Sequence, residues 1–234
     1  MSEPTIHQNK PIICFVEGTI GAGKSTFIKQ LQKYHLNAQF FQEPVAEWQN
    51  TKDGNGKNVL SYFYEDMAKY CYMFQSYAFI TRISQLDDLD LESKDIIFIE
   101  RSIFSDRNVF AETCFETGLL NEIEWITYNT WFYNMLPKYQ HIFDNAYFIY
   151  LQVSPETAME RINKRSRSEE NKISIDYLKT LHQKHESWLG NKESHKDTLK
   201  QNMHILIDAE KDLTQDEEFK QALEQINIHI HSNK

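Results

Sequence analysis

The chain has 234 residues and a formal net charge of −9, because 34 acidic side chains outnumber 25 basic ones. This negative balance argues against a protein that mainly binds nucleic acid or an anionic membrane, since both partners select positive surfaces. A hydrophobic share of 41% supports one sizeable core and is too high for a disordered chain. We therefore expect a single domain over residues 1–234, with residues 1–10 flexible.

The cysteines and the apolar runs bear on the compartment. Cys14, Cys71 and Cys114 form no Cys-x-x-Cys pair, so we expect buried thiols instead of a disulfide framework or a zinc site. No apolar run approaches the roughly 18 to 20 residues of a membrane span, and the start of the chain lacks a hydrophobic signal core. These features predict a cytoplasmic protein.

Five short runs of apolar, β-branched or aromatic residues predict the strands. In chain order they are 12–16, 39–42, 95–99, 147–153 and 204–207. Each run is nearly continuous, which is typical of strands buried on both faces of a parallel sheet. Apolar residues between the runs recur at helical spacing, and the polar segments 51–57 and 190–198 predict loops. The alternation predicts an α/β fold with a five-stranded parallel sheet flanked by helices.

A glycine-rich loop follows the first predicted strand directly and opens a helix. It has the pattern G-x-x-x-x-G-K-[ST] and consists of Gly18, Thr19, Ile20, Gly21, Ala22, Gly23, Lys24, Ser25 and Thr26. Its glycines let backbone N–H groups surround a phosphate, and the helix N-terminus adds positive charge. We expect Lys24 to reach the β- and γ-phosphates of ATP and the Ser25 hydroxyl to bind Mg²⁺.

Two other classes of phosphate-binding protein fit less well. A regulatory GTPase reads guanine with Asn-Lys-x-Asp, and no Asn-Lys pair of this sequence has the aspartate. A motor or transporter ATPase needs a mechanical partner domain, for which 234 residues leave little room. A small phosphotransferase is favoured.

Acidic residues follow the second and third predicted strands, where ligands of such sheets bind. Glu43 begins the segment Glu-Pro-Val, and Glu100 and Arg101 begin Glu-Arg-Ser. A carboxylate such as Glu43 can accept the proton of an alcohol that attacks a phosphoryl group, and Arg101 can orient it and balance its charge. Glu100 can hold Mg²⁺ directly or through water.

Four cations gather within seven residues after the fourth predicted strand. They are Arg161, Lys164, Arg165 and Arg167. Arginines can clamp a phosphoryl group and spread the charge of its transition state. We expect residues 161–172 to form a lid over the phosphate loop.

In this order, the motifs resemble the deoxynucleoside kinase family, which includes deoxyguanosine, deoxycytidine and deoxyadenosine kinases. The resemblance covers about residues 12–213 and rests on the segments 18–26, 43–45, 58–65, 74–77, 100–102, 161–170 and 177–189. It implies a P-loop kinase that transfers the γ-phosphoryl group of ATP, with Mg²⁺, to the 5′-hydroxyl of a deoxyribonucleoside. It also implies that Glu43 is the base and that Arg101 lies between this base and the phosphoryl group.

The resemblance assigns further residues to the nucleoside and to ATP. Gln75 would hydrogen-bond the nucleobase, and Tyr64 and Glu170 would hold the sugar 3′-hydroxyl. Asp212 belongs to a segment that resembles the loop over the donor base. The side chains that would wall the nucleobase are aromatic: Trp48, Phe74 and Phe110.

Arg82 and Asp106 bear on the choice of substrate. They stand at the positions where members of the family that accept purines and cytosine have an arginine and an aspartate, and thymidine-preferring members lack this pair. A paired arginine and aspartate offer donor and acceptor groups to a base, whereas the 5-methyl group of thymine would only desolvate them. We expect purine deoxynucleosides and deoxycytidine to be preferred over thymidine.

The segment around Trp125, Tyr128, Trp131, Phe132 and Met135 predicts a helix with apolar residues on more than one face. One face would pack on the sheet and another on a second subunit. The resemblance likewise implies a homodimer.

Two alternatives remain open from the sequence. A nucleoside monophosphate kinase of the thymidylate kinase type has an arginine just before its acidic-Pro pair, where this chain has Gln42. A nucleotide-binding module without catalysis would bind ATP and be indifferent to Glu43→Gln.

Overall fold

The computed structural model describes residues 10–144, 146–190 and 203–232. At its centre is a five-stranded, all-parallel sheet with the strand order β2-β3-β1-β4-β5. The strands are β1 (Ile12–Glu17), β2 (Ala38–Phe41), β3 (Ile96–Glu100), β4 (Tyr147–Gln152) and β5 (His204–Asp208). The predicted α/β fold is confirmed, and each observed strand end lies within one residue of the predicted end.

The expectation that every strand is buried on both faces is wrong for the two edge strands. The residues of β1, β3 and β4 are almost all buried. Those of β2 are half-buried throughout, and in β5 buried and more exposed positions alternate. An edge strand has a sheet neighbour on one side only, so its apolar side chains lose less contact with water than those of the central strands.

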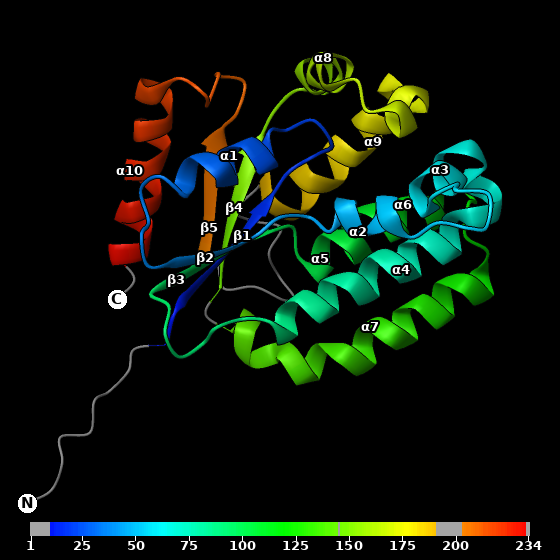
Figure 1. The fold of residues 1–234 in the computed structure, drawn as a ribbon, viewed down its shortest axis with the longest axis horizontal. Coiled ribbons are helices and arrows are strands. Elements are labelled where there is room, and N and C mark those ends of the chain that lie inside the picture. The colour runs from blue at the N-terminus through cyan, green and yellow to red at the C-terminus, as the bar shows by residue number, and fades with distance from the viewer. Residues whose placement is uncertain (1–9, 145, 191–202, 233–234) are drawn as a thin grey trace, which may run out of the picture.

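Two apolar clusters cover the two faces of the sheet. One face packs on α1 (Lys24–Leu31), α8 (Pro155–Arg165), α9 (Ile175–His185) and α10 (Asp216–Ser232). The other packs on α2 (Val45–Asn50), α3 (Val59–Glu65), α4 (Met67–Asp87), α5 (Ile103–Ser105), α6 (Glu112–Glu116) and α7 (Glu122–Phe143). Figure 1 shows α1 and α10 on the side of the sheet away from α4 and α7. The carboxyl ends of the central strands lie between these layers, where α-helices and loops converge.

Three short helical segments complete the described chain. A π-helix, η1 (Asp106–Ala111), joins α5 to α6, and a second one, η3 (Glu186–Gly190), extends α9. A 3₁₀-helix, η2 (Ser168–Lys172), follows α8. The predicted lid therefore consists of the end of α8 and η2, joined at Ser166 in a left-handed conformation with φ of 52°.

The helix α7 has the two apolar faces that the sequence predicts. Tyr128 and Phe132 are buried against the sheet-side cluster, while Trp131 is 53% and Tyr133 58% exposed. Figure 1 shows α7 alongside α4, which exposes Ile80. The layer formed by α4 and α7 thus exposes apolar side chains on its outer face.

Three further expectations concern thiols, membrane spans and loops. All three cysteines are free and buried, as expected. Among the described residues, no helix has the length and hydropathy of a membrane span. The predicted loop 51–57 is present, whereas residues 1–9 and 191–198, for which we expected flexibility and a polar connection, lie outside the described ranges. The cytoplasmic location stays a prediction.

Candidate active site

The phosphate loop between β1 and α1 is closely packed against β4 and α8. Gly18, Gly21 and Gly23 all have positive φ values of 146°, 83° and 91°, which side chains other than hydrogen rarely permit. A Cβ atom on Gly21 would collide with the backbone carbonyl of Ala158. Gly23 caps α1 without a side chain, so the first N–H groups of this helix have no side-chain acceptor. The loop therefore has the conformation and the unpaired donors of an anion site.

Lys24, the first residue of α1, points back into this loop. Its Nζ donates hydrogen bonds to the carbonyl oxygens of Gly18 at 3.1 Å and of Thr19 at 2.9 Å. Burial, together with the nearby Arg101, lowers the pKa of Lys24 to about 7, although neighbouring carboxylates oppose the change. A bound phosphate would supply the missing negative charge, so we expect anion binding to take up a proton at this lysine near neutral pH.

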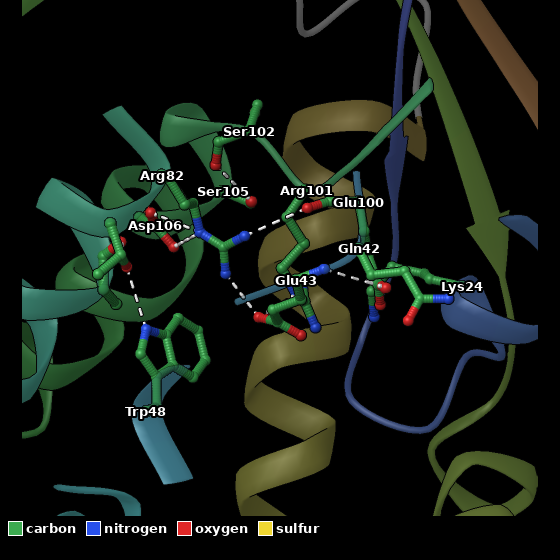
Figure 2. Close-up of polar contacts among 12 residues, drawn as sticks. Lys24, Gln42, Glu43, Trp48, Arg82, Glu100, Arg101, Ser102, Ser105 and Asp106 are labelled. Atoms are coloured by element: carbon green, nitrogen blue, oxygen red, sulfur yellow. Dashed lines mark hydrogen bonds and ion pairs between the residues drawn. The ribbon is translucent and has the colours of Figure 1, made fainter. Parts of the chain in front are cut away.

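Glu43 is held between two arginines that come from different elements (Figure 2). Its Oε1 accepts a hydrogen bond from Nη2 of Arg82 at 2.5 Å and lies 3.2 Å from Nε of Arg101. Burial alone would raise the pKa of Glu43, but Arg101, Arg82 and Lys24 outweigh burial and lower it to about 2. The carboxylate is therefore ionised at neutral pH and ready to accept a hydrogen bond.

Arg101 follows the last residue of β3 in a left-handed conformation, with φ of 65°. Its backbone N–H donates to Val16 at 2.9 Å, and its Nη1 donates to the carbonyl of Gly18 at 2.8 Å. Its guanidinium lies 4.7 Å from the centre of the Phe110 ring. Such a conformation costs a residue with a side chain about 1 kcal/mol or more, and here it turns Arg101 from the sheet toward the phosphate loop.

Glu17 holds the residue that follows this turn, Ser102, and sequence reasoning missed this contact. Its Oε1 accepts hydrogen bonds from the backbone N–H and the hydroxyl of Ser102, at 2.8 and 2.6 Å. Burial raises the pKa of Glu17 to about 7, although Ser102, Arg101 and Ser105 counteract it. The available signal was its place as the last, charged residue of a buried strand.

Arg82 and Asp106 form a fully buried pair. Nε of Arg82 lies 2.8 Å from both carboxylate oxygens of Asp106, and Nη1 donates to the carbonyl of Glu100 at 3.2 Å. Because Arg82 also binds Glu43, it connects the pair to the candidate base (Figure 2). Burial raises the pKa of Asp106 to about 6, against the effect of Arg82. Asp106 is the first residue of η1, a type of helix that often occurs at functional sites.

Ser25 and Glu100 lie together at the mouth of the phosphate loop. The Ser25 hydroxyl donates to Oε1 of Glu100 at 2.9 Å, and the backbone N–H of Glu43 donates to its Oε2 at 3.3 Å. A hydroxyl and one carboxylate fit Mg²⁺, which takes few protein oxygens and completes its shell with phosphates and water. Among the described residues, no group of three or more acidic, histidine or cysteine side chains forms a closed metal site.

The predicted aromatic and amide residues line the inner end of the same space. Trp48 donates from Nε1 to the hydroxyl of Thr81 at 3.0 Å and meets the Phe74 ring edge-on at 5.3 Å. Gln75 is buried, and its Nε2 lies 3.8 Å from Sγ of Cys114. These side chains give this part of the space apolar walls and one buried amide.

One cavity of about 450 Å³ unites most of the predicted residues. This volume suits a small-molecule ligand. The predicted residues that line it are Ile20, Gly21, Gly23, Lys24, Ser25, Thr26, Glu43, Trp48, Tyr64, Phe74, Gln75, Arg82, Glu100, Arg101, Asp106, Phe110, Arg165, Arg167 and Glu170. The predicted residues Gly18, Thr19 and Ala22 are not in the lining and form the base of the loop.

The lid places its charges at the rim of this cavity. Arg165 and Arg167 both form ion pairs with Glu170, the latter with Nη1 2.6 Å from Oε1. Arg165 is 37% exposed, whereas Glu170 is 6% exposed and faces inward. The two arginines therefore line the same cavity as the phosphate loop and share the single negative charge of Glu170.

Arg161 and Asp212 lie outside the lining. The guanidinium of Arg161 donates to the carbonyls of Ala22 at 3.4 Å and Lys211 at 3.3 Å, which joins α8 to the loop after β5. Asp212 accepts hydrogen bonds from the N–H and the hydroxyl of Thr214, at 3.0 and 2.6 Å. Both residues thus shape the loop where a donor base is expected.

Several lining residues were not predicted from the sequence. Four of them are polar and come from four different segments: Lys29, Gln42, Gln49 and Tyr177. The others are apolar: Val45, Ala46, Leu60, Phe63 and Ala78. Gln42 and Lys29 adjoin recognised motifs, which was the one local signal for them. Gln49 becomes part of the site only through the packing of α2, whereas Tyr177 begins the recognised segment 177–189.

Comparisons with known proteins show the family to which the sequence is similar. A sequence model of the family "Deoxynucleoside kinase" matches residues 13–231. The chain is 36% identical to deoxycytidine kinase 2 of Gallus gallus, over 86% of this chain and 83% of the relative. It is 39% identical to deoxycytidine kinase of Homo sapiens, over 82% and 78%. It is 33% identical to the mitochondrial deoxyguanosine kinase of Xenopus laevis, over 84% and 81%.

Proposed function

Because the chain belongs to the deoxynucleoside kinase family and is an enzyme that phosphorylates nucleosides, we propose that it transfers the γ-phosphoryl group of ATP, with Mg²⁺, to the 5′-hydroxyl of a deoxyribonucleoside. The observation that carries this proposal is the position of Glu43. Its ionised carboxylate shares one cavity with the phosphate loop and is paired with Arg82 and Arg101.

The chemistry follows from the groups around Glu43. A 5′-hydroxyl that donates to this carboxylate is oriented for attack on the phosphoryl group above Lys24. In the loose transition state of phosphoryl transfer the hydroxyl loses its proton late, so a carboxylate of low pKa suffices to orient the hydroxyl and take the proton. Arg101 contacts both Glu43 and the loop carbonyl of Gly18, so its guanidinium can stabilise the negative charge that develops in the transition state.

The lid and the metal would complete the site. Arg165 and Arg167 would leave Glu170 and turn to the phosphoryl oxygens when ATP binds. Ser25 and Glu100 would hold Mg²⁺, which supplies charge neutralisation and orients the β- and γ-phosphates. The same exchange would free the Glu170 carboxylate to accept a hydrogen bond from the sugar 3′-hydroxyl beside Tyr64.

The test of this function is the substitution Glu43→Gln. The amide keeps the size of the side chain but cannot take a proton, so we expect kcat to fall by about 10²- to 10⁴-fold while ATP still binds. The control is Glu47→Gln, which changes an acid of the same segment that bonds Tyr77 instead. ADP release is measured with a deoxynucleoside and with its monophosphate. Unchanged kcat in Glu43→Gln, or preference for the monophosphate, would refute the proposal.

The buried pair of Arg82 and Asp106 supports a preference for purine deoxynucleosides and deoxycytidine over thymidine. Removing one partner would leave an unpaired buried charge, so the double variant Arg82→Met, Asp106→Ala is the informative one. We expect its ratio of purine to thymidine activity to fall at least about tenfold, as one good polar contact to a base is worth about 1–3 kcal/mol. An unchanged ratio contradicts the preference.

The outer surface of α4 and α7 supports a homodimer. Ile80, Ile126, Trp131 and Tyr133 are all more than two-fifths exposed, and a shallow groove on α7 adjoins them. A second copy of the chain would bury these side chains. Light scattering should give the mass of two chains, and Trp131→Glu should give that of one. A monomeric wild-type protein would remove the dimer from the proposal.

A further inference from the structure

The amide of Gln75 has a sulfur neighbour that the proposed reaction does not use. Its Nε2 donates a hydrogen bond to Sγ of Cys114 at 3.8 Å. Gln75 belongs to α4, and Cys114 belongs to α6, thirty-nine positions later, so only the packing of these helices creates the contact. Gln75 is 2% exposed and Cys114 is fully buried, so the contact is shielded from water.

A second thiol holds the sulfur of Cys114 in place. Cys71 precedes Gln75 by four residues on α4, so the two side chains lie on the same face of this helix. A hydrogen bond to Cys114, and then burial, raises the pKa of Cys71 above its ordinary range, so Cys71 stays a thiol and donates to Cys114. Both thiols are free and buried. The sulfur of Cys114 therefore faces α4 and accepts from Cys71 and Gln75.

This contact leaves the oxygen of the amide for a ligand. Gln75 lines the cavity, and the described residues supply no donor to its Oε1. Asp106 also lines the cavity, and its buried Oδ2 accepts no hydrogen bond within the described part of the chain. Each nitrogen of Arg82, in contrast, already donates to a protein oxygen. The polar atoms that remain for a base at this end of the cavity are therefore acceptors.

Nucleobases differ in the order of donor and acceptor along the edge that a primary amide can bind. Cytosine and adenine have an exocyclic amino donor beside a ring nitrogen that accepts, whereas uracil and hypoxanthine have a carbonyl acceptor beside a ring N–H. A glutamine whose amide turns freely can exchange Oε1 and Nε2 and so suit both orders. An amide that is held in one orientation suits only one of them.

We propose that Cys114 is a positioning residue that holds the Gln75 amide with Oε1 toward the exocyclic group of the base, so that the site prefers amino bases to keto bases. This inference rests on the proposed function and narrows its substrates. An amide turned the other way gives up the hydrogen bond to the sulfur. The free Oδ2 of Asp106 favours the same bases, because a carbonyl oxygen beside it would face another oxygen.

The matched variants are Cys114→Val and Cys114→Ser. Valine is close to cysteine in size but accepts no hydrogen bond, so the amide can turn; Cys114→Ala makes the same test if valine prevents folding. Serine keeps an acceptor, because a serine hydroxyl inside a helix can donate to a carbonyl one turn earlier and leave its lone pairs free. The control is Cys14→Val, because Cys14 is as buried as Cys114 but lies in β1 and packs in the other apolar cluster.

The readout is kcat and KM with ATP for two pairs of substrates, deoxycytidine with deoxyuridine and deoxyadenosine with deoxyinosine. Each pair differs only at the exocyclic group and the adjacent ring nitrogen. We expect the wild type to prefer the amino member of each pair. Cys114→Val should lower this ratio of kcat/KM about three- to tenfold, through KM, since one neutral hydrogen bond is worth about that much. Cys114→Ser and Cys14→Val should keep the ratio within about twofold of the wild type.

The outcomes separate this inference from the proposed function. A wild type that phosphorylates these nucleosides without preferring amino bases contradicts the inference, and so does an unchanged ratio in Cys114→Val. An equal loss for both members of a pair, or the same change of ratio in Cys14→Val, would make Cys114 a core residue only. If the wild type phosphorylates none of the four nucleosides, the proposed function itself fails.

Discussion

The floor and the lid of the cavity are built from the same residue types but by different means. On the floor, Glu43, Arg82 and Asp106 come from three separate elements and are held by buried, short contacts. In the lid, Arg165 and Glu170 are five residues apart, and Arg165 is 37% exposed although Glu170 is buried. Buried charges are little screened by water, so the floor is preformed, whereas the lid pairs can exchange partners at low cost.

This difference assigns the two regions different tasks. In the proposed function, the floor would hold the candidate base Glu43 and Arg101 in place before a ligand binds, which is the arrangement that stabilises a transition state without reorganisation. The lid must let substrates in and products out, so its interactions have to be replaceable. Substitutions in the floor should therefore affect the chemical step and stability, and substitutions at the lid and its hinge should affect binding.

The largest expected effect on activity is that of a substitution in the phosphate loop, which we count with the floor. In Gly21→Ala the new Cβ atom would collide with the carbonyl of Ala158 at a positive φ, so the loop must move away from α8. We expect ATP-dependent activity to fall at least about a hundredfold, since small displacements of a catalytic geometry cost about that much. Gly54→Ala is the control, because a Cβ at that position meets no atom within 4 Å. Near-wild-type activity of Gly21→Ala would show that the floor is not rigid.

A second prediction tests the buried charge under Arg101. The native pKa of Glu17, about 7, lies above its ordinary value of 4.5, so the native state holds this proton more tightly than the unfolded state does. The stability that this tighter proton binding contributes is fully present below pH 4.5 and is lost as the pH rises through 7. Between pH 5 and 7, Glu17→Gln should therefore lose less stability than the wild type, by on the order of 2 kcal/mol.

Urea unfolding at the two pH values measures this difference. Asp106, whose pKa is raised to about 6, changes the free energy of unfolding with pH in the same way in both proteins. The difference between the two proteins therefore reports on Glu17. Above pH 7 the lowered pKa of Lys24 makes the free energy of unfolding rise with pH, because the lysine keeps its proton to a higher pH in the unfolded state than in the native state. Equal pH dependence in Glu17→Gln and the wild type would mean that Glu17 does not titrate in this range.

The smallest expected effect on activity is at Arg161, the first residue of the lid, where we place its hinge. Arg161→Met removes hydrogen bonds of 3.3–3.5 Å to the carbonyls of Ala22, Glu210 and Lys211. These bonds are long and partly exposed, so we expect the KM for ATP to rise roughly two- to fivefold and the KM for the nucleoside to stay unchanged. Lys164→Met, an exposed cation on the same helix, is the control. A loss of kcat would place Arg161 with the floor residues.

Local patterns determined much of this protein before any packing was considered. Continuous apolar runs located all five strands to within one residue, because burial on a central sheet leaves a strong signal. The phosphate loop was equally clear, since strand, glycines, lysine and helix are contiguous and their geometry is local. Glu43 and Arg101 could be placed from their positions just after strands, where parallel strands all end at one edge.

Tertiary structure decided which of these residues touch, and which others join them. No sequence pattern links Arg82 to Glu43, thirty-nine positions away, yet their 2.5 Å contact connects the buried pair of Arg82 and Asp106 to the candidate base. Glu17 looked like an ordinary acid and acquired its partner Ser102 only when β1 and β3 came together. The physical reason is that a short-range code fixes backbone conformation and burial, whereas hydrogen bonds between distant side chains depend on how complete elements pack.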